Sequence, residues 1–200
     1  MPASRSLATL RKAVDACRGC DLYKRATQAV FGAGSRDARV LLIGEQPGDR
    51  EDQEGKPFVG PAGALLTRAL GAAKLDPAAI YVTNAVKHFS WEPRGKRRIH
   101  KKPRASEIRA CRPWLDAELE AVRPDLIVCL GATASLAVMG AAFRLTAHRG
   151  EVLPGPGGGR VVATIHPSAV LRAPDEAGRR EAFEGLVADL AVAARVLRGA

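Results

Sequence analysis

The chain lacks the features that mark membrane-spanning, secreted and fibrous proteins. Its 200 residues contain no apolar run long enough to cross a bilayer, and residues 1–18 have no apolar core of the kind found in secretory signals. No internal repeat is evident, and hydrophobic residues make up an ordinary 46%. We therefore expect a cytoplasmic, monomeric protein with no membrane partner, folded as a single domain over residues 1–200.

Acidic residues are scarce relative to basic ones. The sequence has 31 Lys and Arg but only 21 Asp and Glu, which gives a formal net charge of +10 at pH 7 with His neutral. The basic residues are concentrated between Lys87 and Arg112 rather than spread along the chain. Because a local basic patch attracts a polyanion, we expect a groove for DNA or RNA in this region.

Cysteine is also rare, and the four residues are Cys17, Cys20, Cys111 and Cys129. In a reducing compartment these thiols are poor candidates for a disulfide framework, so metal ligation is the better interpretation. Cys17 and Cys20 form a CxxC motif whose glycine allows a tight turn. The spacing suits zinc or a 4Fe-4S cluster, with a redox pair or unconnected buried thiols as the alternatives.

The hydrophobic pattern predicts an α/β fold. Short, fully apolar segments typical of buried strands alternate with segments whose apolar residues recur at helical spacing. The expected strands cover residues 40–43, 80–84, 126–130 and 161–165. The expected helices cover residues 4–16, 61–70, 106–122, 132–139 and 175–197, with Ser106 as a helix cap. We predict three α/β/α layers around a central, mainly parallel four-stranded sheet.

Polar residues stand where the predicted strands end. Glu45 follows the first strand, Asn84 ends the second, and His166 follows the fourth. Parallel strands end at the same edge of a sheet, and ligands of such folds bind outside these carboxyl ends. We therefore expect these three side chains to line one crevice.

The most basic segment, residues 94–102, contains a single imidazole, His100. We expect a loop here whose cations contact DNA phosphates, with Arg98 also holding the loop in place. The candidate phosphate-binding residues are Lys96, Arg97, Arg98, Lys101 and Lys102. Because surrounding cations disfavour a proton on imidazole, we predict a lowered pKa for His100 and a neutral, nucleophilic ring. The alternative is a solvated basic loop with an incidental histidine.

Four segments together carry a resemblance to a known family. They are Gly44-Glu45-Gln46-Pro47-Gly48, the segment from Lys56 to Gly63, Val82-Thr83-Asn84, and His166-Pro167-Ser168. With the four cysteines, they resemble the iron-sulfur uracil-DNA glycosylases of family 4, over nearly the whole chain from Cys17 onward. Gln46, where alanine commonly follows the acid, and the basic segment with His100 depart from ordinary members. Both departures resemble the UdgX branch, whose members become covalently attached to uracil-containing DNA.

The resemblance implies a role for each candidate residue in binding. A structural 4Fe-4S cluster would be bound by Cys17, Cys20, Cys111 and Cys129. Uracil would be bound by Gly44, Gln46, Phe58, Asn84 and His166. Phe58 would stack on the flipped base, and the Asn84 amide would pair with uracil O4 and N3–H and reject cytosine. His166 would donate a hydrogen bond to O2 as negative charge develops there. Without the family, these residues suit a packed core, a strand-end turn and a structural histidine equally well.

The resemblance implies two possible reactions of the deoxyribose after uracil departs. In an ordinary family member, Glu45 would orient or activate a water for attack at C1′. In the UdgX branch, neutral His100 would capture the oxocarbenium-like sugar while Glu45, directly or through water, accepts its other proton. The protein would then release free uracil, keep the DNA and act once. Gln46 would help to position the water or the base.

Two rival interpretations stay open at this point. The first is a conventional glycosylase with multiple turnovers, whose basic loop only grips DNA. The second is a nonenzymatic nucleic-acid-binding module folded around zinc. Asp52 is expected either to support the basic segment or to be a solvated acid, and Lys87 and His88 are expected to face DNA without a catalytic part.

Overall fold

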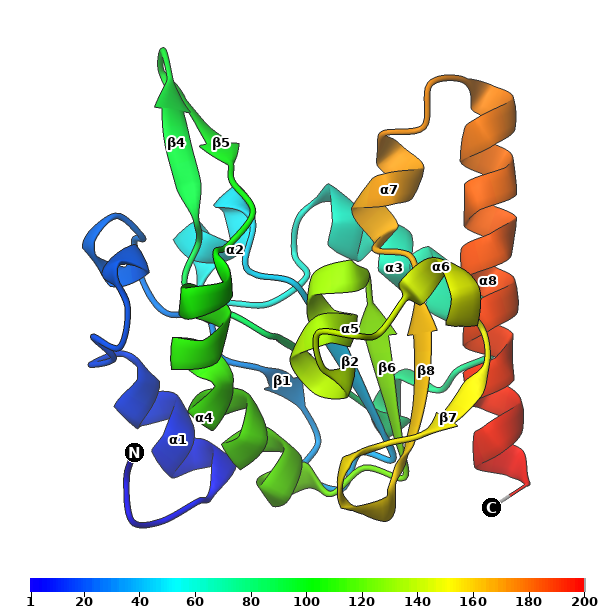
Figure 1. The fold of residues 1–200 in the computed structure, drawn as a ribbon, viewed down its shortest axis with the longest axis horizontal. Coiled ribbons are helices and arrows are strands. Elements are labelled where there is room, and N and C mark those ends of the chain that lie inside the picture. Colours follow the sequence, from blue (N-terminus) through cyan, green and yellow to red (C-terminus); the bar gives the residue numbers. More distant parts are fainter. Residues whose placement is uncertain (200) are drawn as a thin grey trace.

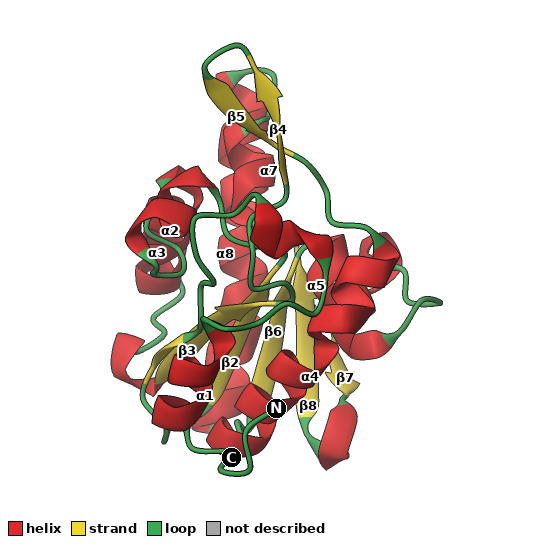
Figure 2. Ribbon diagram, turned by 90° about the vertical axis from the view of Figure 1, so that its left-hand side faces the viewer, coloured by secondary structure: helices red, strands yellow, loops and turns green. Residues whose placement is uncertain are grey.

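Six strands form one sheet in the computed structural model, which describes residues 1–199 (Figure 1, Figure 2). Their spatial order is β1-β3-β2-β6-β8-β7. The strands are β1 (Ala33–Gly34), β2 (Val40–Gly44), β3 (Ile80–Asn84), β6 (Leu126–Leu130), β7 (Val152–Pro154) and β8 (Arg160–Thr164). The four central strands are parallel, and β1 and β7 run antiparallel to their neighbours. The predicted α/β fold and its four parallel strands are confirmed, and one short strand is added at each edge.

The register of the central strands decides where the polar residues lie. Every residue of β2 and β6 is buried, as expected for apolar strands covered on both faces. Gly44 pairs with Asn84, and Leu130 pairs with Thr164. The residues that end or follow these strands are therefore brought to one edge of the sheet.

Helices cover both faces of the sheet. They are α1 (Leu7–Val14), α2 (Asp49–Glu54), α3 (Pro61–Ala72), α4 (Ala105–Val122), α5 (Ala132–Met139), α6 (Leu145–His148), α7 (Pro167–Leu171) and α8 (Glu176–Arg198). Helices α3, α7 and α8 pack against one face, around Leu42 and Val128. Helices α4 and α5 pack against the other, around Leu41 and Ile43, and α1 packs against α4. Within residues 1–199, no helix is long and apolar enough to span a membrane.

Three helices begin at other residues than predicted, and α8 differs by only one residue because Asp175 is its cap. Ser6 caps α1, because its hydroxyl accepts a hydrogen bond from the Thr9 main-chain N–H at 3.2 Å. This helix ends at Val14, so the CxxC motif lies in the turn after it. Helix α4 begins at Ala105, where the Glu107 carboxylate accepts the Arg104 main-chain N–H at 2.7 Å. Ser106 is therefore not the cap of this helix.

The basic segment is a β-hairpin and not the predicted loop. Strand β4 (Trp91–Arg94) pairs antiparallel with β5 (Arg97–His100), and Gly95 adopts a φ of +60° in the two-residue turn. The hairpin projects from the end of the molecule toward which β6 and β8 point, the end where α7 also lies (Figure 1). His100 pairs with Trp91 at the base of this hairpin, which brings it toward the sheet.

Candidate active site

A cavity of about 860 Å³ lies at the carboxyl ends of the parallel strands. We call it the carboxyl-end cavity. The sequence-predicted residues that line it are Glu45, Gln46, Phe58, Asn84, His100, Lys102 and His166. They come from the ends of β2, β3 and β8, from the segment before α3, and from the hairpin with the residues that follow it. The predicted meeting of Glu45, Asn84 and His166 in one crevice is therefore confirmed.

The floor of the cavity is shaped by Gly44, Asn84 and Phe58. A Cβ at Gly44 would lie 2.3 Å from Asn84 Oδ1 and 2.7 Å from Phe58 Cζ, so only glycine fits there. Asn84 is 3% exposed, and among residues 1–199 its side-chain amide has no hydrogen-bond partner. Both arms of this amide are therefore available to a ligand.

Phe58 is held in an unusual backbone conformation beside His166. Its φ is +57°, a left-handed value that is costly for a residue with a side chain. The Phe58 and His166 rings are stacked, with centroids 6.3 Å apart and planes 28° apart. Gly63 permits this arrangement, because a Cβ there would lie 1.8 Å from the Phe58 carbonyl oxygen. The two rings thus form an aromatic wall of the cavity.

The hydrogen bonds of His166 assign its tautomer. Its Nδ1 accepts the Ser168 main-chain N–H at 3.1 Å and lies 2.7 Å from the Ser168 hydroxyl. Arg172 Nη1 donates to that hydroxyl oxygen at 2.9 Å, which leaves the hydroxyl proton for Nδ1. Burial, and then the charges of Arg172 and His100, lower the pKa of His166 to about 4. The ring is therefore neutral at pH 7 and carries its proton on Nε2.

Glu45 stands between His100 and Thr133. His100 Nε2 lies 3.4 Å from Glu45 Oε1, and the Thr133 hydroxyl donates to Glu45 Oε2. Thr133 belongs to the first turn of α5, which follows directly on β6. One carboxylate oxygen is thus fixed by the body of the protein, and the other faces the imidazole.

The pKa of His100 is lowered, as predicted, but mainly for another reason. Burial has the largest effect, Glu45 opposes it, and Arg172 lowers the pKa further. The lysines and arginines of the hairpin are not among the causes. Most of them are exposed to solvent, and the charge of Arg98 is paired with Asp49 and Asp52. The neutral ring is thus a property of the cavity wall more than of the basic segment.

Gln46 contacts the hairpin with both ends of its amide. Its Nε2 donates to the main-chain carbonyls of Ser90 at 3.0 Å and Lys101 at 3.1 Å, and its Oε1 accepts the Ser90 N–H at 3.1 Å. Ser90 precedes β4 and Lys101 follows β5. Gln46 therefore joins the two ends of the hairpin to β2, a different position from the expected contact with water or base.

Arg98 points into the protein and anchors the hairpin from its other side. It forms ion pairs of 2.6 Å with both Asp49 and Asp52. Asp52 is fully buried and also accepts the Thr27 main-chain N–H at 2.9 Å. Asp52 thus supports the basic segment, and the alternative of a solvated acid is wrong. The remaining candidates for phosphate binding, Lys96, Arg97, Lys101 and Lys102, are exposed.

Lys87 and His88 do not face a DNA groove, contrary to the prediction. Lys87 is fully buried, where its ammonium pairs with Glu118 and donates to the Asn84 main-chain carbonyl at 2.7 Å. His88 is 4% exposed. Both are buried because the chain turns from β3 into the layer beneath α4, where Glu118 compensates the buried charge.

Three of the four cysteines come together, and Cys129 does not. Cys17 and Cys111 belong to the apolar cluster between α1 and α4, where Trp114 Nε1 donates to Cys17 Sγ at 3.2 Å. Cys17 and Cys20 both raise the pKa of the Cys111 thiol, although burial raises it most. Cys129 instead lies inside β6 among Leu41, Ile43 and other core residues. Burial alone raises the pKa of its thiol, so no other cysteine is near. The predicted set of four cysteine ligands is therefore wrong at Cys129.

The spacing of these groups distinguishes a single ion from a cluster. Within residues 1–199, no three His, Cys, Asp or Glu side chains are close enough to bind one metal ion. A four-iron cluster has wider requirements, because each of its irons takes one protein ligand. Cys17, Cys20 and Cys111 are the cysteines that could contribute to such a cluster.

Thr133, Ser168 and Arg172 were missed by the sequence reasoning. Thr133 follows the end of β6, so the rule that located Glu45 and His166 could have found it. Ser168 and Arg172 are four residues apart and meet through one turn of helix. Their tie to His166 depends on the cap geometry of α7, for which the sequence offered no signal.

The chain is similar in sequence to known uracil-DNA glycosylases. The sequence profile of the uracil DNA glycosylase superfamily matches residues 31–191. A type-4 uracil-DNA glycosylase of Thermotoga maritima is 38% identical over 174 residues, covering 86% of this chain and 87% of the relative. One from Archaeoglobus fulgidus is 36% identical over 186 residues, covering 90% and 88%. A type-5 uracil-DNA glycosylase of Pyrobaculum aerophilum is 34% identical over 153 residues, covering 68% and 63%.

Proposed function

The chain belongs to the uracil-DNA glycosylase superfamily, and from this premise we propose that it excises uracil from DNA and then bonds to the abasic sugar through His100. The position of the His100 ring is the observation that supports the proposed bond to the abasic sugar. Its Nε2 lies 3.4 Å from Glu45 Oε1 at the wall of the carboxyl-end cavity. An imidazole in this position can reach the atom that an activated water would otherwise attack.

Recognition of uracil is assigned to Asn84, Phe58 and Gly44. The free amide of Asn84 offers an acceptor for N3–H and a donor for O4, and cytosine presents the opposite pattern. Phe58 offers a ring for stacking, and the missing side chain of Gly44 leaves room for the base edge. A base can reach this cavity only after it leaves the stack, so single-stranded DNA is the preferred substrate.

Departure of uracil is assisted by His166 as a neutral donor. Breaking the glycosidic bond leaves the bonding electron pair on the base, where negative charge spreads to O2. The Nε2–H of His166 donates to this oxygen, and the Ser168 contacts keep the proton on that nitrogen. A donor that is already oriented needs no rearrangement as the charge develops.

Capture of the sugar is assigned to His100 Nε2. The lone pair of the neutral ring forms a bond to C1′ as uracil leaves as an anion, so the ring becomes a singly charged imidazolium. The Glu45 carboxylate, oriented by Thr133, stabilises first the oxocarbenium-like sugar and then this imidazolium. The ring is about half exposed, so its remaining N–H proton can pass to solvent.

A denaturing gel tests the proposal. A uracil-containing single-stranded oligonucleotide should give an adduct that survives heating in detergent, with uracil released in proportion to protein. Mass spectrometry of the digested adduct should place one deoxyribose on the His100 peptide. An adduct on any other peptide would reassign the nucleophile.

A conventional glycosylase with multiple turnovers is the second candidate, and the names of the type-4 relatives favour it. In that case Glu45 would activate a water, and limiting protein would release many equivalents of uracil without an adduct. Burst-and-stop release of one equivalent excludes this candidate.

We also propose a 4Fe-4S cluster with a structural role, on the basis of the gathered cysteines. Cys17, Cys20 and Cys111 would bind it, joining the turn after α1 to helix α4. The excision reaction needs no electron, so the cluster is assigned no step in it. The unpaired thiols suit a cytoplasmic monomer, which is the state we expect.

A further inference from the structure

A buried ion pair lies next to Asn84, the residue assigned to read uracil. Lys87 follows β3 and Glu118 belongs to α4, and both side chains are fully buried against each other. The Lys87 ammonium also donates to the Asn84 main-chain carbonyl at 2.7 Å. We propose that Lys87 and Glu118 are positioning residues, which hold the turn after β3 and so aim the Asn84 amide into the carboxyl-end cavity. This inference rests on the proposed function, because it takes Asn84 as the residue that reads the base.

The Asn84 amide is not aimed by partners of its own. Its side chain is 3% exposed and has no hydrogen-bond partner within residues 1–199. An amide that reads a ligand must keep its donor and its acceptor free for that ligand. Its direction must therefore come from the main chain of Asn84 and from packing.

The main chain of Asn84 is held by a side chain at the point where the strand ends. Asn84 is the last residue of β3, and it pairs with Gly44 of β2. The next main-chain N–H, that of Ala85, still donates to the Gly44 carbonyl at 2.9 Å. The Asn84 carbonyl accepts the Lys87 ammonium. Because this carbonyl lies in the peptide plane that leaves the Asn84 Cα, the contact restricts ψ of Asn84 and holds the atom from which the side chain projects.

Lys87 is itself fixed, because every N–H of its ammonium has a partner. The three partners are the Asn84 carbonyl and the Thr83 hydroxyl, each at 2.7 Å, and the Glu118 carboxylate. An ammonium has three donors and no acceptor, so this set leaves none of them free. The Asn84 carbonyl therefore receives a donor of fixed position.

Glu118 is fixed in turn by residues before and within β3. Its Oε1 accepts the Tyr81 hydroxyl and the Gly32 main-chain N–H, both at 2.9 Å, and its Oε2 accepts the Thr83 hydroxyl at 2.9 Å. A Cβ at Gly32 would overlap Oε1, so the glycine makes room for this carboxylate. The hydrogen bonds that converge on Glu118 thus continue through Lys87 to Asn84.

Stability alone does not account for a fully buried ion pair. Taking two charges out of water is costly, and apolar side chains of similar volume often stabilise a core as well or better. An apolar side chain cannot supply a donor for the Asn84 carbonyl, however, and a buried carbonyl without a donor is unfavourable. The carbonyl that they hold therefore explains the buried charges of Lys87 and Glu118.

The experiment removes the donor without leaving an unpaired charge. Lys87→Met combined with Glu118→Gln makes the pair neutral, preserves the lengths of the side chains and deletes the contact to the Asn84 carbonyl. This double variant is compared with the wild type, with Asn84→Ala, and with the triple variant that carries all three substitutions. The measurements are single-turnover release of labelled uracil and the NMR signals of the Asn84 side-chain amide in ¹⁵N-labelled protein, identified by their loss in Asn84→Ala.

The matched control is a second ion pair that also binds a strand threonine. Arg149 pairs with Asp189 at 2.8 Å, and Asp189 accepts the Thr164 hydroxyl at 2.6 Å. None of these three residues lines the carboxyl-end cavity. Arg149→Met combined with Asp189→Asn should therefore keep uracil release within twofold of the wild type and leave the Asn84 amide signals in place.

The double variant at Lys87 and Glu118 should release uracil about tenfold more slowly than the wild type, the effect of one hydrogen bond to a charged group. Its Asn84 amide signals should shift. Asn84→Ala alone should be about 100-fold slower than the wild type. The triple variant should stay within twofold of Asn84→Ala, because the ion pair acts through an amide that is already gone.

Three results would overturn the inference. One is a triple variant slower than Asn84→Ala by the same tenfold factor, since the ion pair would then act independently of the amide. Another is a double variant that keeps the wild-type rate and unshifted amide signals. The third is an equal loss of rate in the control pair, because any buried ion pair would then have the same effect.

A milder pair of variants keeps the test decisive if the double variant does not fold. Thr83→Val removes one partner of the Lys87 ammonium and leaves the charges paired, so release should slow by about threefold. Thr83→Ser restores the hydroxyl and should recover the rate, whereas equal rates in both variants would overturn the inference. Failure of the proposed function is a different result: the wild type would release no uracil, or Asn84→Ala would keep the wild-type rate.

Discussion

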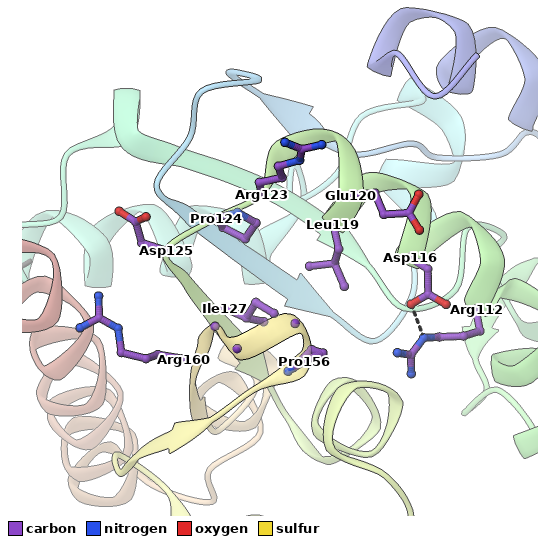
Figure 3. A pocket seen from close by; sticks show the side chains of 13 residues that line it. Arg112, Asp116, Leu119, Glu120, Arg123, Pro124, Asp125, Ile127, Pro156 and Arg160 are labelled. Atoms are coloured by element: carbon purple, nitrogen blue, oxygen red, sulfur yellow. Dashed lines mark hydrogen bonds and ion pairs between the residues drawn. The ribbon is translucent and has the colours of Figure 1, made fainter. Parts of the chain in front are cut away.

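Two cavities of nearly equal volume lie at opposite ends of the parallel sheet. The carboxyl-end cavity measures about 860 Å³, and the other measures about 840 Å³. We call the second the amino-end cavity, because Asp125 and Ile127 at the start of β6 and Arg160 at the start of β8 line it. Figure 3 shows its side chains, with Arg112 and Asp116 joined by a hydrogen bond.

The two cavities differ in how their polar groups are used. In the amino-end cavity, Arg112 pairs with Asp116 at 2.6 Å, and Asp125 pairs with Arg39 at 2.6 Å. In the carboxyl-end cavity, the Asn84 amide is free, burial keeps His166 neutral, and partial desolvation lowers the pKa of His100. Volume therefore does not identify the site, whereas unpaired and oriented polar groups do.

Replacing His100 tests the carboxyl-end cavity most severely. His100→Ala should abolish the covalent adduct completely, because no other nucleophile of the hairpin faces Glu45. The matched control is His148→Ala, since His148 is an exposed histidine paired with Glu151 and does not line the cavity. Denaturing gels with a uracil-containing oligonucleotide measure both variants. An undiminished adduct in His100→Ala would remove the proposed nucleophile.

Loss of the Asn84 amide should reduce excision without changing the fate of the sugar. Asn84→Ala leaves uracil O4 and N3–H without partners, and we expect uracil release to slow by about 100-fold. The adduct should still form, at the rate of release. Single-turnover release of labelled uracil is the measurement, and a rate within threefold of the wild type would contradict the assignment.

Thr133 should act through Glu45, as a positioning residue. Thr133→Val keeps the shape but removes the hydroxyl that holds Oε2, so adduct formation should slow by about tenfold, the worth of one charge-assisted hydrogen bond. Thr133→Ser restores the hydroxyl and should recover most of the rate. If both variants slow equally, the packing of the Thr133 methyl group is responsible and the positioning role fails.

Acidic conditions should affect uracil release very little. The pKa of His166 is lowered to about 4, so its neutral donor form dominates at pH 5.5 and is lost only as the pH falls through about 4. A histidine of ordinary pKa would be about 90% protonated at pH 5.5. In His100→Ala, where water takes the place of the ring, we expect less than twofold loss of single-turnover release between pH 7 and 5.5, and a midpoint near 6.5 would show that His166 is not buried as described.

Substitutions in the amino-end cavity should have the smallest effect. Asp116→Asn breaks the ion pair between Asp116 and Arg112. Both side chains are partly exposed, so the substitution should change the free energy of unfolding very little. Uracil release and adduct formation should stay within twofold of the wild type. A larger loss in either assay would show that this cavity contributes to function and would break the contrast between the two ends.

The sequence predicted best where one physical rule dominates. Continuous apolar strands must be covered on both faces, which predicted the parallel sheet and the meeting of Glu45, Asn84 and His166 at its carboxyl edge. Parallel strands all end at the same edge of the sheet, so the direction of the strands located the site without any knowledge of side-chain contacts. Residue type and strand position together were sufficient for these three residues.

The predictions failed where a side chain had several possible partners. Lys87 and Cys129 were assigned by residue type, yet each is placed by packing against a distant segment. The basic segment was predicted as a loop because its many charges hide the alternation of its strands. Its pairing depends on one glycine turn and on the Arg98 anchor.

By itself, the sequence determined the layers, the strand directions and the edge where polar groups gather, because hydrophobic patterning and backbone direction are local properties. Only the tertiary structure decided which polar groups are free and which are engaged. Gln46 is bound by the hairpin, Lys87 by Glu118, and Cys129 by the core, whereas Asn84 and His88 have no hydrogen-bond partner for their side chains within residues 1–199. Such pairings join residues far apart in the chain, so they depend on distances that exist only after folding.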